Sequence, residues 1–265
     1  MNSLLKTAIT AALKAGEEIL HIYQDPDTDF GIERKADNSP LTIADRKSND
    51  IIMEYLATTP YPVISEENKT VAFETRRQWQ TVWIVDPLDG TKEFIKRNGE
   101  FTVNIALTRD GNPVLGVIYI PVRQTLYYGS DQGAFRAEHV TASTEADLLR
   151  IQEQAQRLPV GHSGASCVVV ASRSHMSPET ETFINELRRQ KGSVELTSVG
   201  SSIKICLVAE GTADIYPRFA PTMEWDTAAG HAIAKAAGKE LYQTDGTTPL
   251  TYNKENLLNP WFIAK

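Results

Sequence analysis

Two aspartates three positions apart, Asp86 and Asp89, follow a short apolar run and stand directly before Gly90 and Thr91. Magnesium prefers oxygen ligands, usually one or two carboxylates together with phosphate oxygens from a substrate. The main-chain carbonyl of Leu88, between the two aspartates, offers a third ligand of the same kind. The N–H groups that follow Gly90 stand at the start of an expected helix, where a phosphate binds well. The segment therefore predicts a site at which hard cations and a phosphate meet.

A tight turn is the alternative interpretation of residues 86–91, because proline presets the backbone and aspartate and glycine are common in turns. The apolar strand predicted before it favours the site, since a buried strand would fix both carboxylates toward one pocket. Two metal ions about 3.5–4 Å apart are the usual clamp for in-line phosphoryl transfer. Phosphatases with an aspartate nucleophile have one residue between their two aspartates, whereas two residues separate Asp86 from Asp89. We therefore expect water, and not an aspartate, to attack the phosphate.

A site with two metal ions needs more carboxylates than this segment supplies, and three further acidic residues stand at the ends of predicted elements. Glu66 follows an apolar strand, Asp45 falls in the first turn of a helix, and Asp226 starts an alanine-rich helix. Each also has an ordinary interpretation, Glu66 as a solvated acidic helix start and the two aspartates as capping signals. We expect all three to reach the pocket, with Asp226 acting both as helix N-cap and as metal ligand.

Two further segments carry candidate binding residues. Residues 200–204, Gly-Ser-Ser-Ile-Lys, form a small-residue turn into a helix and match the Ser-x-x-Lys pattern of acyl-transfer enzymes. The companion Ser-Asp-Asn and Lys-Thr-Gly motifs are absent, so a phosphate or ribose contact at a helix start fits better. His175 follows the predicted strand 168–171, where open α/β sheets place ligands, although a loop histidine is the ordinary interpretation.

The composition excludes several classes of function. A net charge of −7 argues against a general grip on DNA or RNA polymers, while local cations can still hold a small anionic substrate. We expect no secretory signal and no bilayer-spanning segment, because charged residues interrupt the apolar runs. The two cysteines, Cys167 and Cys206, are expected to be buried free thiols. We expect a cytoplasmic protein, with peripheral attachment to the inner face of the membrane left open.

The elements that must position these side chains are predicted from the spacing of apolar residues. A hairpin is indicated around residues 109–112, Arg-Asp-Gly-Asn, and the first helix is expected to be capped by Ser3. Strands and helices alternate in the last third of the chain, which favours an α/β arrangement there. The expected helices cover residues 3–23, 43–56, 178–189, 203–210 and 227–237, and the expected strands cover 62–65, 82–85, 101–107, 114–120, 126–128, 134–136, 168–171, 194–198 and 213–216.

The polar stretch 139–166 is the best candidate for a domain boundary, because it contains a proline and two glycines and separates two different patterns. We predict an N-terminal α+β domain, residues 1–158, with most of the metal ligands. A C-terminal α/β domain, residues 159–265, would complete the metal and substrate site. Residues 137–166 have no assigned role.

Four blocks in order make the chain similar to the inositol monophosphatase superfamily of magnesium-dependent, lithium-sensitive phosphatases. Within it, the chain most resembles the bacterial 3′(2′),5′-bisphosphate nucleotidases. The resemblance runs nearly end to end but is weak between residues 137 and 166. The four blocks are Asp45 after Ser-Pro-Leu-Thr, Glu66 in Ser-Glu-Glu, residues 86–91 and Trp225-Asp226, and the closer resemblance rests on residues 35–40, 86–107, 207–211, 216–219 and 224–231.

The resemblance implies a layered αβαβα fold and a site with two or three Mg²⁺ ions, inhibited by Li⁺. Asp45 and Thr91 would activate the attacking water, and the N–H groups of Gly90 and Thr91 would hold the phosphate. The metal ligands implied are Glu66, Asp86, the Leu88 carbonyl, Asp89 and Asp226, of which Glu66 also acts in catalysis and Asp226 also borders the substrate. The nucleotide pocket implied is lined by Ser172, His175, Gly200, Ser201 and Lys204.

These residues lead to one main hypothesis and two alternatives. The main hypothesis is hydrolysis of the 3′-phosphate of adenosine 3′,5′-bisphosphate to AMP and phosphate, in sulfur assimilation, with 3′-phosphoadenylyl sulfate as a further substrate. The first alternative keeps the superfamily but changes the substrate to inositol monophosphate or fructose 1,6-bisphosphate. Residues 35–40 and 200–204 favour the nucleotidase. The second alternative is a non-catalytic nucleotide or metal sensor, which would have no need of the water-activating pair Asp45 and Thr91.

Overall fold

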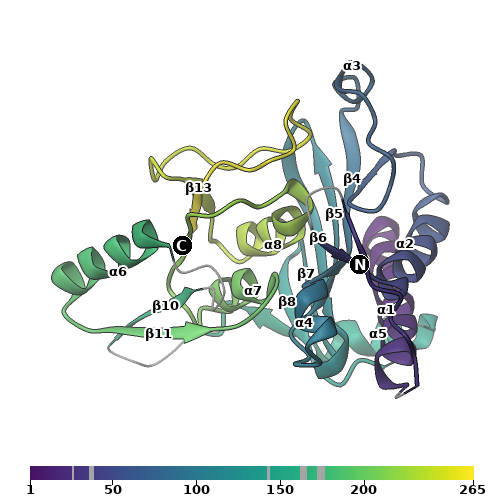
Figure 1. The fold of residues 1–265 in the computed structure, drawn as a ribbon, viewed down its shortest axis with the longest axis horizontal. Coiled ribbons are helices and arrows are strands. Elements are labelled where there is room, and N and C mark those ends of the chain that lie inside the picture. The colour runs from purple at the N-terminus through teal and green to yellow at the C-terminus, as the bar shows by residue number, and fades with distance from the viewer. Residues whose placement is uncertain (26, 36–38, 142–143, 162–165, 172–176) are drawn as a thin grey trace.

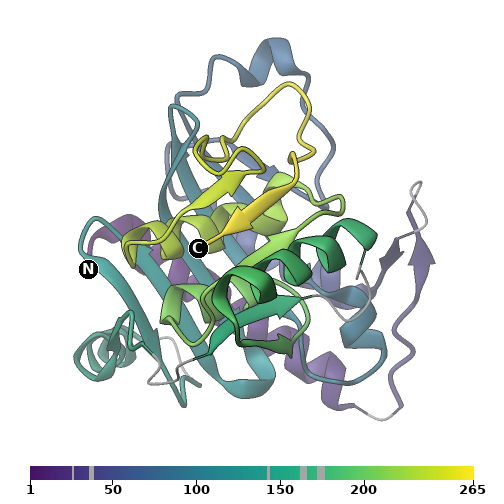
Figure 2. The same cartoon turned by 90° about the vertical axis from the view of Figure 1, so that its left-hand side faces the viewer.

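The computed structural model describes residues 1–265 except 26, 36–38, 142–143, 162–165 and 172–176. A seven-stranded sheet stands in the middle, covered on one face by α1 (Ser3–Gln24) and α2 (Ile43–Leu56). Helices α7 (Ile203–Glu210) and α8 (Glu224–Ala236) cover its other face (Figure 1). Beyond them lie two smaller sheets and then α6 (Pro178–Lys191), as Figures 1 and 2 show from two sides. The predicted αβαβα layers are confirmed.

The central sheet has the strand order β3-β4-β5-β6-β7-β8-β9. Its first pair, β3 and β4, is parallel, and every later pair is antiparallel. The hairpin predicted around residues 109–112 joins β5 to β6, as expected. The strands are β3 (Val63–Ser65), β4 (Thr81–Asp89), β5 (Thr102–Arg109), β6 (Asn112–Ile120), β7 (Thr125–Ser130), β8 (Gly133–Ala137) and β9 (Gln156–Leu158).

The two faces of this sheet belong to two different hydrophobic cores, because side chains along a strand alternate between faces. On β4, Trp83 and Val85 pack in the core with α1 and α2. Their neighbours Val82 and Ile84 pack in the core with α7 and α8. The same alternation directs the side chain of Asp86, the next even-numbered residue of β4, toward α8.

The helices on the first face begin at side-chain caps. The N-cap of α1 is Asn2, whose Oδ1 accepts a hydrogen bond from the N–H of Leu5 at 2.8 Å. The prediction that Ser3 is the cap is wrong, because Ser3 is already the first helical residue and a cap must precede it. Thr42 caps α2, and Asp45 lies in the first turn of that helix as predicted.

Helix α8 lies directly on the backbone of the central sheet. A Cβ atom added to Gly116 of β6 would lie 2.2 Å from the carbonyl oxygen of Ala229. One added to Gly129 of β7 would lie 2.7 Å from the Cα atom of Ile233. Two glycines thus permit a helix-to-sheet approach that any larger residue would prevent.

The last third of the chain forms the two smaller sheets. The predicted strand-helix-strand unit is present as β10 (Cys167–Ala171), α6 and β11 (Val194–Ser198), with the two strands parallel. An antiparallel sheet has the order β12 (Tyr216–Arg218), β14 (Phe262–Ala264) and β13 (Leu241–Gln243). The strand predicted at 213–216 lies later in the chain, at Tyr216–Arg218. Before it, Ile215 forms a single parallel bridge with Val169. Helix α8 starts at Glu224 and not at the predicted residue 227. The acidic residues of its first turn do not follow the apolar spacing from which the helix was predicted.

The polar stretch 139–166 contains regular structure that the sequence did not indicate. It holds α5 (Glu145–Gln154), and β9 extends the central sheet by pairing with β8. The division into domains 1–158 and 159–265 stays a prediction. The remaining short elements are β1 (Glu33–Arg34), β2 (Pro40–Leu41), α3 (Phe73–Arg76), α4 (Thr91–Ile95) and a 3-10 turn, η1 (Pro121–Arg123).

The two cysteines are both free thiols. Cys206 is buried as expected, but Cys167 is half-buried because it stands at the first position of β10. Within the described residues, the helices include none with the length and apolarity that crossing a bilayer requires.

Candidate active site

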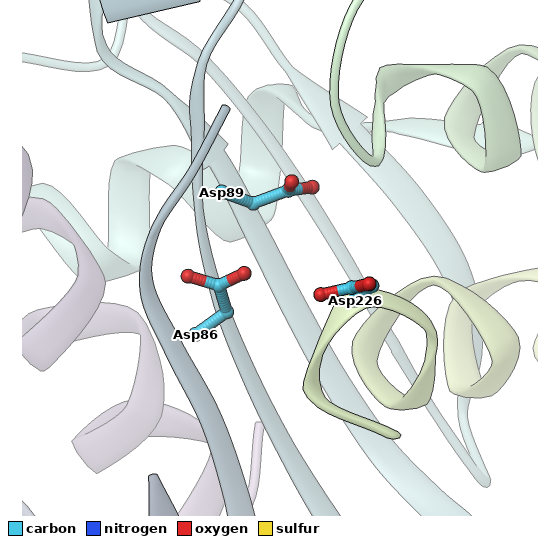
Figure 3. A group of neighbouring side chains, drawn as sticks. All are labelled: Asp86, Asp89 and Asp226. Atoms are coloured by element: carbon cyan, nitrogen blue, oxygen red, sulfur yellow. The ribbon is translucent and has the colours of Figure 1, made fainter. Parts of the chain in front are cut away.

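Asp86 and Asp89 lie at the end of β4, where the strand departs from regular pairing. Asp86 pairs with Asn104 of β5 and Asp89 pairs with Thr102, so three residues along β4 match two along β5. Regular alternation would point two side chains three positions apart to opposite faces. The bulge turns Asp89 to the face on which Asp86 lies, so both carboxylates approach α8 (Figure 3). A bulged strand end therefore presents both to one pocket.

Asp226 reaches the same pocket from the first turn of α8 (Figure 3). The N-cap of α8 is Met223, and the Oδ2 atom of Asp226 accepts the Met223 N–H at 2.9 Å. The prediction that Asp226 is itself the N-cap is wrong, because the helix begins at Glu224. The carboxylate still serves the helix start by reaching back to it. Candidate ligand oxygens of Asp86, Asp89 and Asp226 all lie within 4.8 Å of one another.

Three carboxylates this close oppose one another's ionisation. Burial and the neighbouring carboxylates raise the pKa of Asp86 well above its ordinary value. Burial, followed by the charge of Asp89, raises the pKa of Asp226 to about 8. A divalent cation among these oxygens would replace the repulsion with attraction. A donor set made of carboxylates, without thiolate or imidazole, fits a hard cation such as Mg²⁺.

Glu66 joins this cluster from the end of β3. Its N–H donates to the carbonyl of Val85 at 3.1 Å, and its carboxyl group hydrogen-bonds that of Asp86. Lys35 Nζ lies 2.7 Å from Glu66 Oε1 and 2.5 Å from Glu67 Oε1. Burial raises the pKa of Glu66 even though Lys35 opposes the shift. Lys35 was not predicted as a site residue, although it opens the 35–40 block on which the resemblance rests.

Asp45 and Thr91 form the predicted hydrogen-bonded pair. Thr91 Oγ1 donates to Asp45 Oδ1 at 3.0 Å, while Asp45 Oδ2 accepts from the N–H and the hydroxyl of Thr42 at 2.7 and 2.5 Å. Burial raises the pKa of Asp45. On the same helix, Ser48 donates its hydroxyl to the carbonyl of Pro87 at 2.6 Å. Helix α2 therefore fixes both the aspartate and the bulged end of β4.

Asp89 is held by two residues that the sequence did not reveal as site residues. Its Oδ2 accepts the Ser202 N–H at 2.6 Å and the Asn104 side-chain amide at 3.4 Å. The hydroxyl oxygen of Ser202 lies 2.5 Å from the same Oδ2 and 2.9 Å from the carbonyl oxygen of Asp226. Ser202 thus links two candidate metal ligands. Its place in the turn at 200–204 was the only available signal.

A cavity of about 360 Å³ opens beside Asp89 and Asp226. Five of the predicted substrate residues line it, namely Gly90, Gly200, Ser201, Lys204 and Asp226. Gly90 has a φ of +95°, a left-handed conformation that favours glycine at the start of α4. The N–H of Gly200 donates to Glu100 Oε2 at 2.8 Å, so the turn that shapes this cavity is fixed. Of the other predicted substrate residues, Thr91 follows Gly90 but is not among the residues that line the cavity, and Ser172 and His175 lie outside the described residues.

Two hydrogen-bond donors among the residues that line this cavity have no partner. Within the described residues, Ser201 Oγ and Arg218 Nε are buried without a hydrogen-bond partner. Lys204 Nζ, by contrast, donates to the carbonyls of Val199 and Ser201 at 3.1 and 2.8 Å. Burial lowers the pKa of Lys204 to about 8. Arg218 was not predicted as a site residue, although it lies in the 216–219 block.

The chain belongs to the inositol monophosphatase family, whose model matches residues 1–261. It is 46% identical to the 3′(2′),5′-bisphosphate nucleotidase CysQ of Salmonella typhimurium over 261 residues, which is 98% of each chain. The crystal structure of CysQ from Bacteroides thetaiotaomicron is similar with a TM-score of 0.92 and 58% identity, covering 99% of this chain and 97% of that one. An IMPase from Thermotoga maritima, at 21% identity and a TM-score of 0.75, shares the fold over 100% of this chain and 92% of that one.

Proposed function

We propose that the chain is a metal-dependent phosphatase that hydrolyses the 3′-phosphate of adenosine 3′,5′-bisphosphate to AMP and phosphate. The proposal is carried by one cavity that joins two unlike ends. The mutually repelling carboxylates, of which Asp89 and Asp226 line the cavity, are called the metal end, and the unpartnered donors of Ser201 and Arg218, which also line it, are called the other end. Carboxylates suit cations, and free donors suit phosphate or ribose oxygens. Two relatives named 3′(2′),5′-bisphosphate nucleotidase align with the chain over 98% of their length, and their name supports the choice of substrate.

Magnesium is the proposed metal, bound as two ions. Glu66, Asp86 and the Leu88 carbonyl would hold one ion, and Asp86, Asp89 and Asp226 would hold the other. Thr91 Oγ1 lies 3.4 Å from the Leu88 carbonyl oxygen, so that carbonyl is directed toward the catalytic threonine. Bound ions of this kind supply Lewis-acid stabilisation of the phosphoryl oxygens and an acidified water.

Thr91 and Asp45 are the proposed route for the proton of the attacking water. Because Thr91 Oγ1 lies 3.0 Å from Asp45 Oδ1, its hydroxyl can donate to that carboxylate while a lone pair of Oγ1 accepts the proton from the water. The second oxygen of Asp45 is held by Thr42, which prevents rotation of the carboxylate. A raised pKa makes Asp45 a better proton acceptor than an exposed aspartate.

The other end of the cavity would bind the nucleotide. The N–H groups of Gly90 and Thr91 would hold the reacting phosphate beside the metal ions. Ser201 Oγ and Arg218 Nε would donate to the remaining phosphate or the ribose, which satisfies both orphaned donors. Lys204 supports this end chiefly through the two loop carbonyls that it binds.

The alternatives have weaker support. Inositol monophosphate or fructose 1,6-bisphosphate would use the same metal cluster, but the nucleotidase relatives are the more similar proteins. The IMPase relative is only 21% identical, which supports a shared fold alone. A non-catalytic sensor would leave the hydrogen-bonded pair of Thr91 and Asp45 without a use.

The test is phosphate release from adenosine 3′,5′-bisphosphate, inositol 1-phosphate and fructose 1,6-bisphosphate, measured side by side. We expect the nucleotide to have the highest kcat/KM, with activity lost in EDTA, restored by Mg²⁺ and inhibited by Li⁺. Including 3′-phosphoadenylyl sulfate tests the proposed second substrate. A preference for inositol phosphate would overturn the nucleotidase proposal and leave the metal site standing.

A role in sulfur assimilation and a cytoplasmic location belong to the same proposal. The free thiols of Cys167 and Cys206 support a reducing compartment. Deletion of the gene should raise cellular adenosine 3′,5′-bisphosphate, and nucleotide levels unchanged by deletion would contradict this role.

A further inference from the structure

The first turn of α8, which carries Asp226, is held by a loop from the end of the chain, residues 253–259. Met223 forms an isolated antiparallel bridge with Leu258, and the side-chain amide of Asn259 donates to the Met223 carbonyl at 2.7 Å. Met223 is also the residue whose N–H holds the Asp226 carboxylate at 2.9 Å. The loop therefore fixes the residue that orients a candidate metal ligand.

Glu224 is a second attachment of this loop to the helix. Its side chain is completely buried, and its carboxylate accepts three hydrogen bonds. The N–H groups of Asn253 and Lys254 donate at 2.6 and 3.0 Å, and Lys254 Nζ donates at 2.5 Å. A buried carboxylate with this many partners resists displacement, because moving it would leave a charge unpaired. Glu224 thus clamps the start of α8 to the loop.

Arg76 of α3 holds the same loop from its other side, with a side chain that is 3% exposed. Its Nη1 donates to Asn253 Oδ1 at 2.9 Å and to the Lys254 carbonyl at 3.0 Å. Its Nη2 donates to the Glu255 carbonyl at 3.2 Å, and Asn253 returns a hydrogen bond to the Arg76 carbonyl at 2.8 Å. The planar fork of a guanidinium group reaches several acceptors at once, which an ammonium group does not reproduce.

These contacts connect the start of α8, which carries Asp226, to the segment between β3 and β4, which carries Arg76. Arg76 lies on the connection between β3 and β4, the two strands that end at candidate metal ligands. We propose that Arg76, Asn253 and Glu224 form a brace that places Asp226 against the ligands of the sheet and so sets the affinity for the second metal ion. The three are positioning residues, since none lines the substrate cavity. The inference rests on the proposed role of Asp226 as a metal ligand.

Glu224→Gln is the main test. Glutamine keeps the size of the side chain and can still accept from the main chain, but it leaves the Lys254 ammonium without its carboxylate. We expect the Mg²⁺ concentration for half-maximal activity to rise about tenfold, the lower limit for loss of an outer-shell partner. At saturating Mg²⁺, kcat and the KM for the nucleotide should return to nearly the wild-type values. Calorimetric titration with Mg²⁺ alone should show the same loss of affinity.

Glu210→Gln is the matched control. Glu210 is also a buried glutamate, bonded to Tyr127 Oη at 2.6 Å and to Arg136 Nη1 at 2.7 Å, and it ends α7 away from the metal cluster. We expect this variant to lose thermal stability comparably without any change in Mg²⁺ affinity. Equal Mg²⁺ affinity in the Glu224→Gln and Glu210→Gln variants would overturn the proposal that Arg76, Asn253 and Glu224 position Asp226.

Arg76→Lys is the second variant, for the case in which Glu224→Gln fails to fold. It keeps the charge and loses the fork, so Mg²⁺ affinity should fall in the same direction. Wild-type Mg²⁺ affinity in a folded Arg76→Lys protein would overturn the proposal. Because calorimetry needs no substrate, a weakened metal site in a protein that lacks nucleotidase activity would overturn only the proposed function.

Discussion

In the metal end, Asp86, Asp89 and Asp226 face one another with candidate ligand oxygens within 4.8 Å (Figure 3). At the other end, Ser201 and Arg218 present buried donors that have no acceptor within the described residues. The first end crowds negative charge together, and the second has an N–H and an O–H donor without acceptors. Each end is incomplete in the way that suits one component of the reaction, the cation or the anion.

The two ends also differ in how they are held. Hydrogen bonds from Ser202 and Thr42 fix the oxygens of Asp89 and Asp45, so the metal end is stiff before any ion binds. Ser201, at the other end, belongs to the same turn that supplies Ser202, and the conformation of this turn depends on Lys204 and on the contact between Gly200 and Glu100. Substitutions at the first end should therefore change the chemical step, whereas substitutions at the second should change substrate affinity.

Asp86→Asn should have the largest effect of all. The amide removes a charge that both proposed ions share, and a loss of about 4 kcal/mol of transition-state stabilisation corresponds to roughly a thousandfold lower kcat. Thermal melting of the metal-free variant is the control, and it should show no loss of stability because a repelling carboxylate has gone. Near-full activity at saturating Mg²⁺ would contradict the assignment of the metal end.

Thr91→Val should lower kcat by about a hundredfold, the usual contribution of positioned acid-base catalysis at its lower limit. Valine keeps the shape of the side chain and removes the hydroxyl that donates to Asp45. Thr91→Ser, which restores a hydroxyl, should recover most of the rate. A valine variant that also loses Mg²⁺ affinity would show that Thr91 supports the metal end instead of moving a proton.

Arg218→Gln should act at the other end and raise the KM for the nucleotide about tenfold, because a hydrogen bond to a charged group contributes about 1.5–3 kcal/mol. Mg²⁺ affinity should stay at the wild-type value. Arg157→Gln serves as control, since Arg157 stacks on Phe135 and does not line the cavity. A fall in kcat with unchanged KM would erase the distinction between the two ends.

The smallest effect should be on thermal stability as a function of pH. The pKa of Asp226 is raised from 3.8 to about 8 in the folded protein, so its contribution to stability is full below about pH 3.8 and is lost as the pH rises through about 8. The melting temperature in EDTA should therefore fall by a few degrees between pH 5 and pH 8. The proposed Mg²⁺ would bind the deprotonated carboxylates, so its stabilising effect should grow over the same range.

Asp226→Asn provides the comparison for that measurement. It removes the shifted carboxyl group, so the metal-free protein should lose less stability than the wild type as the pH rises. A wild-type melting temperature that stays flat from pH 5 to pH 8 would contradict the crowding inferred for the metal end.

Much of the metal end could be predicted because it depends on local sequence. The strand before Asp86 and the first turn of α2 are local patterns, and the structure contains both. The bulge that turns Asp89 was not predicted, since it arises from pairing with β5. Ser202 was missed for the same reason, because the residue that it holds lies 113 positions earlier.

The other end was harder to predict. A donor is recognisable as unpartnered only when its surroundings are known, so membership of the 216–219 block is the one sequence feature that sets Arg218 apart from an ordinary surface arginine. The position of Asp226 within its helix was also misjudged, because the N-cap of α8 is a methionine and gives no capping signal.

The glycines under α8 have a consequence for the position of Asp226 relative to the sheet. Gly116 and Gly129 let α8 rest on the sheet backbone, and a single methyl group at Gly116 would meet a carbonyl oxygen at 2.2 Å. Asp226 lies in that helix, whereas Asp86 and Asp89 lie in the sheet. Gly116 and Gly129 therefore set how near Asp226 lies to Asp86 and Asp89, and a methyl group added to either glycine would push α8, and Asp226 with it, away from the sheet.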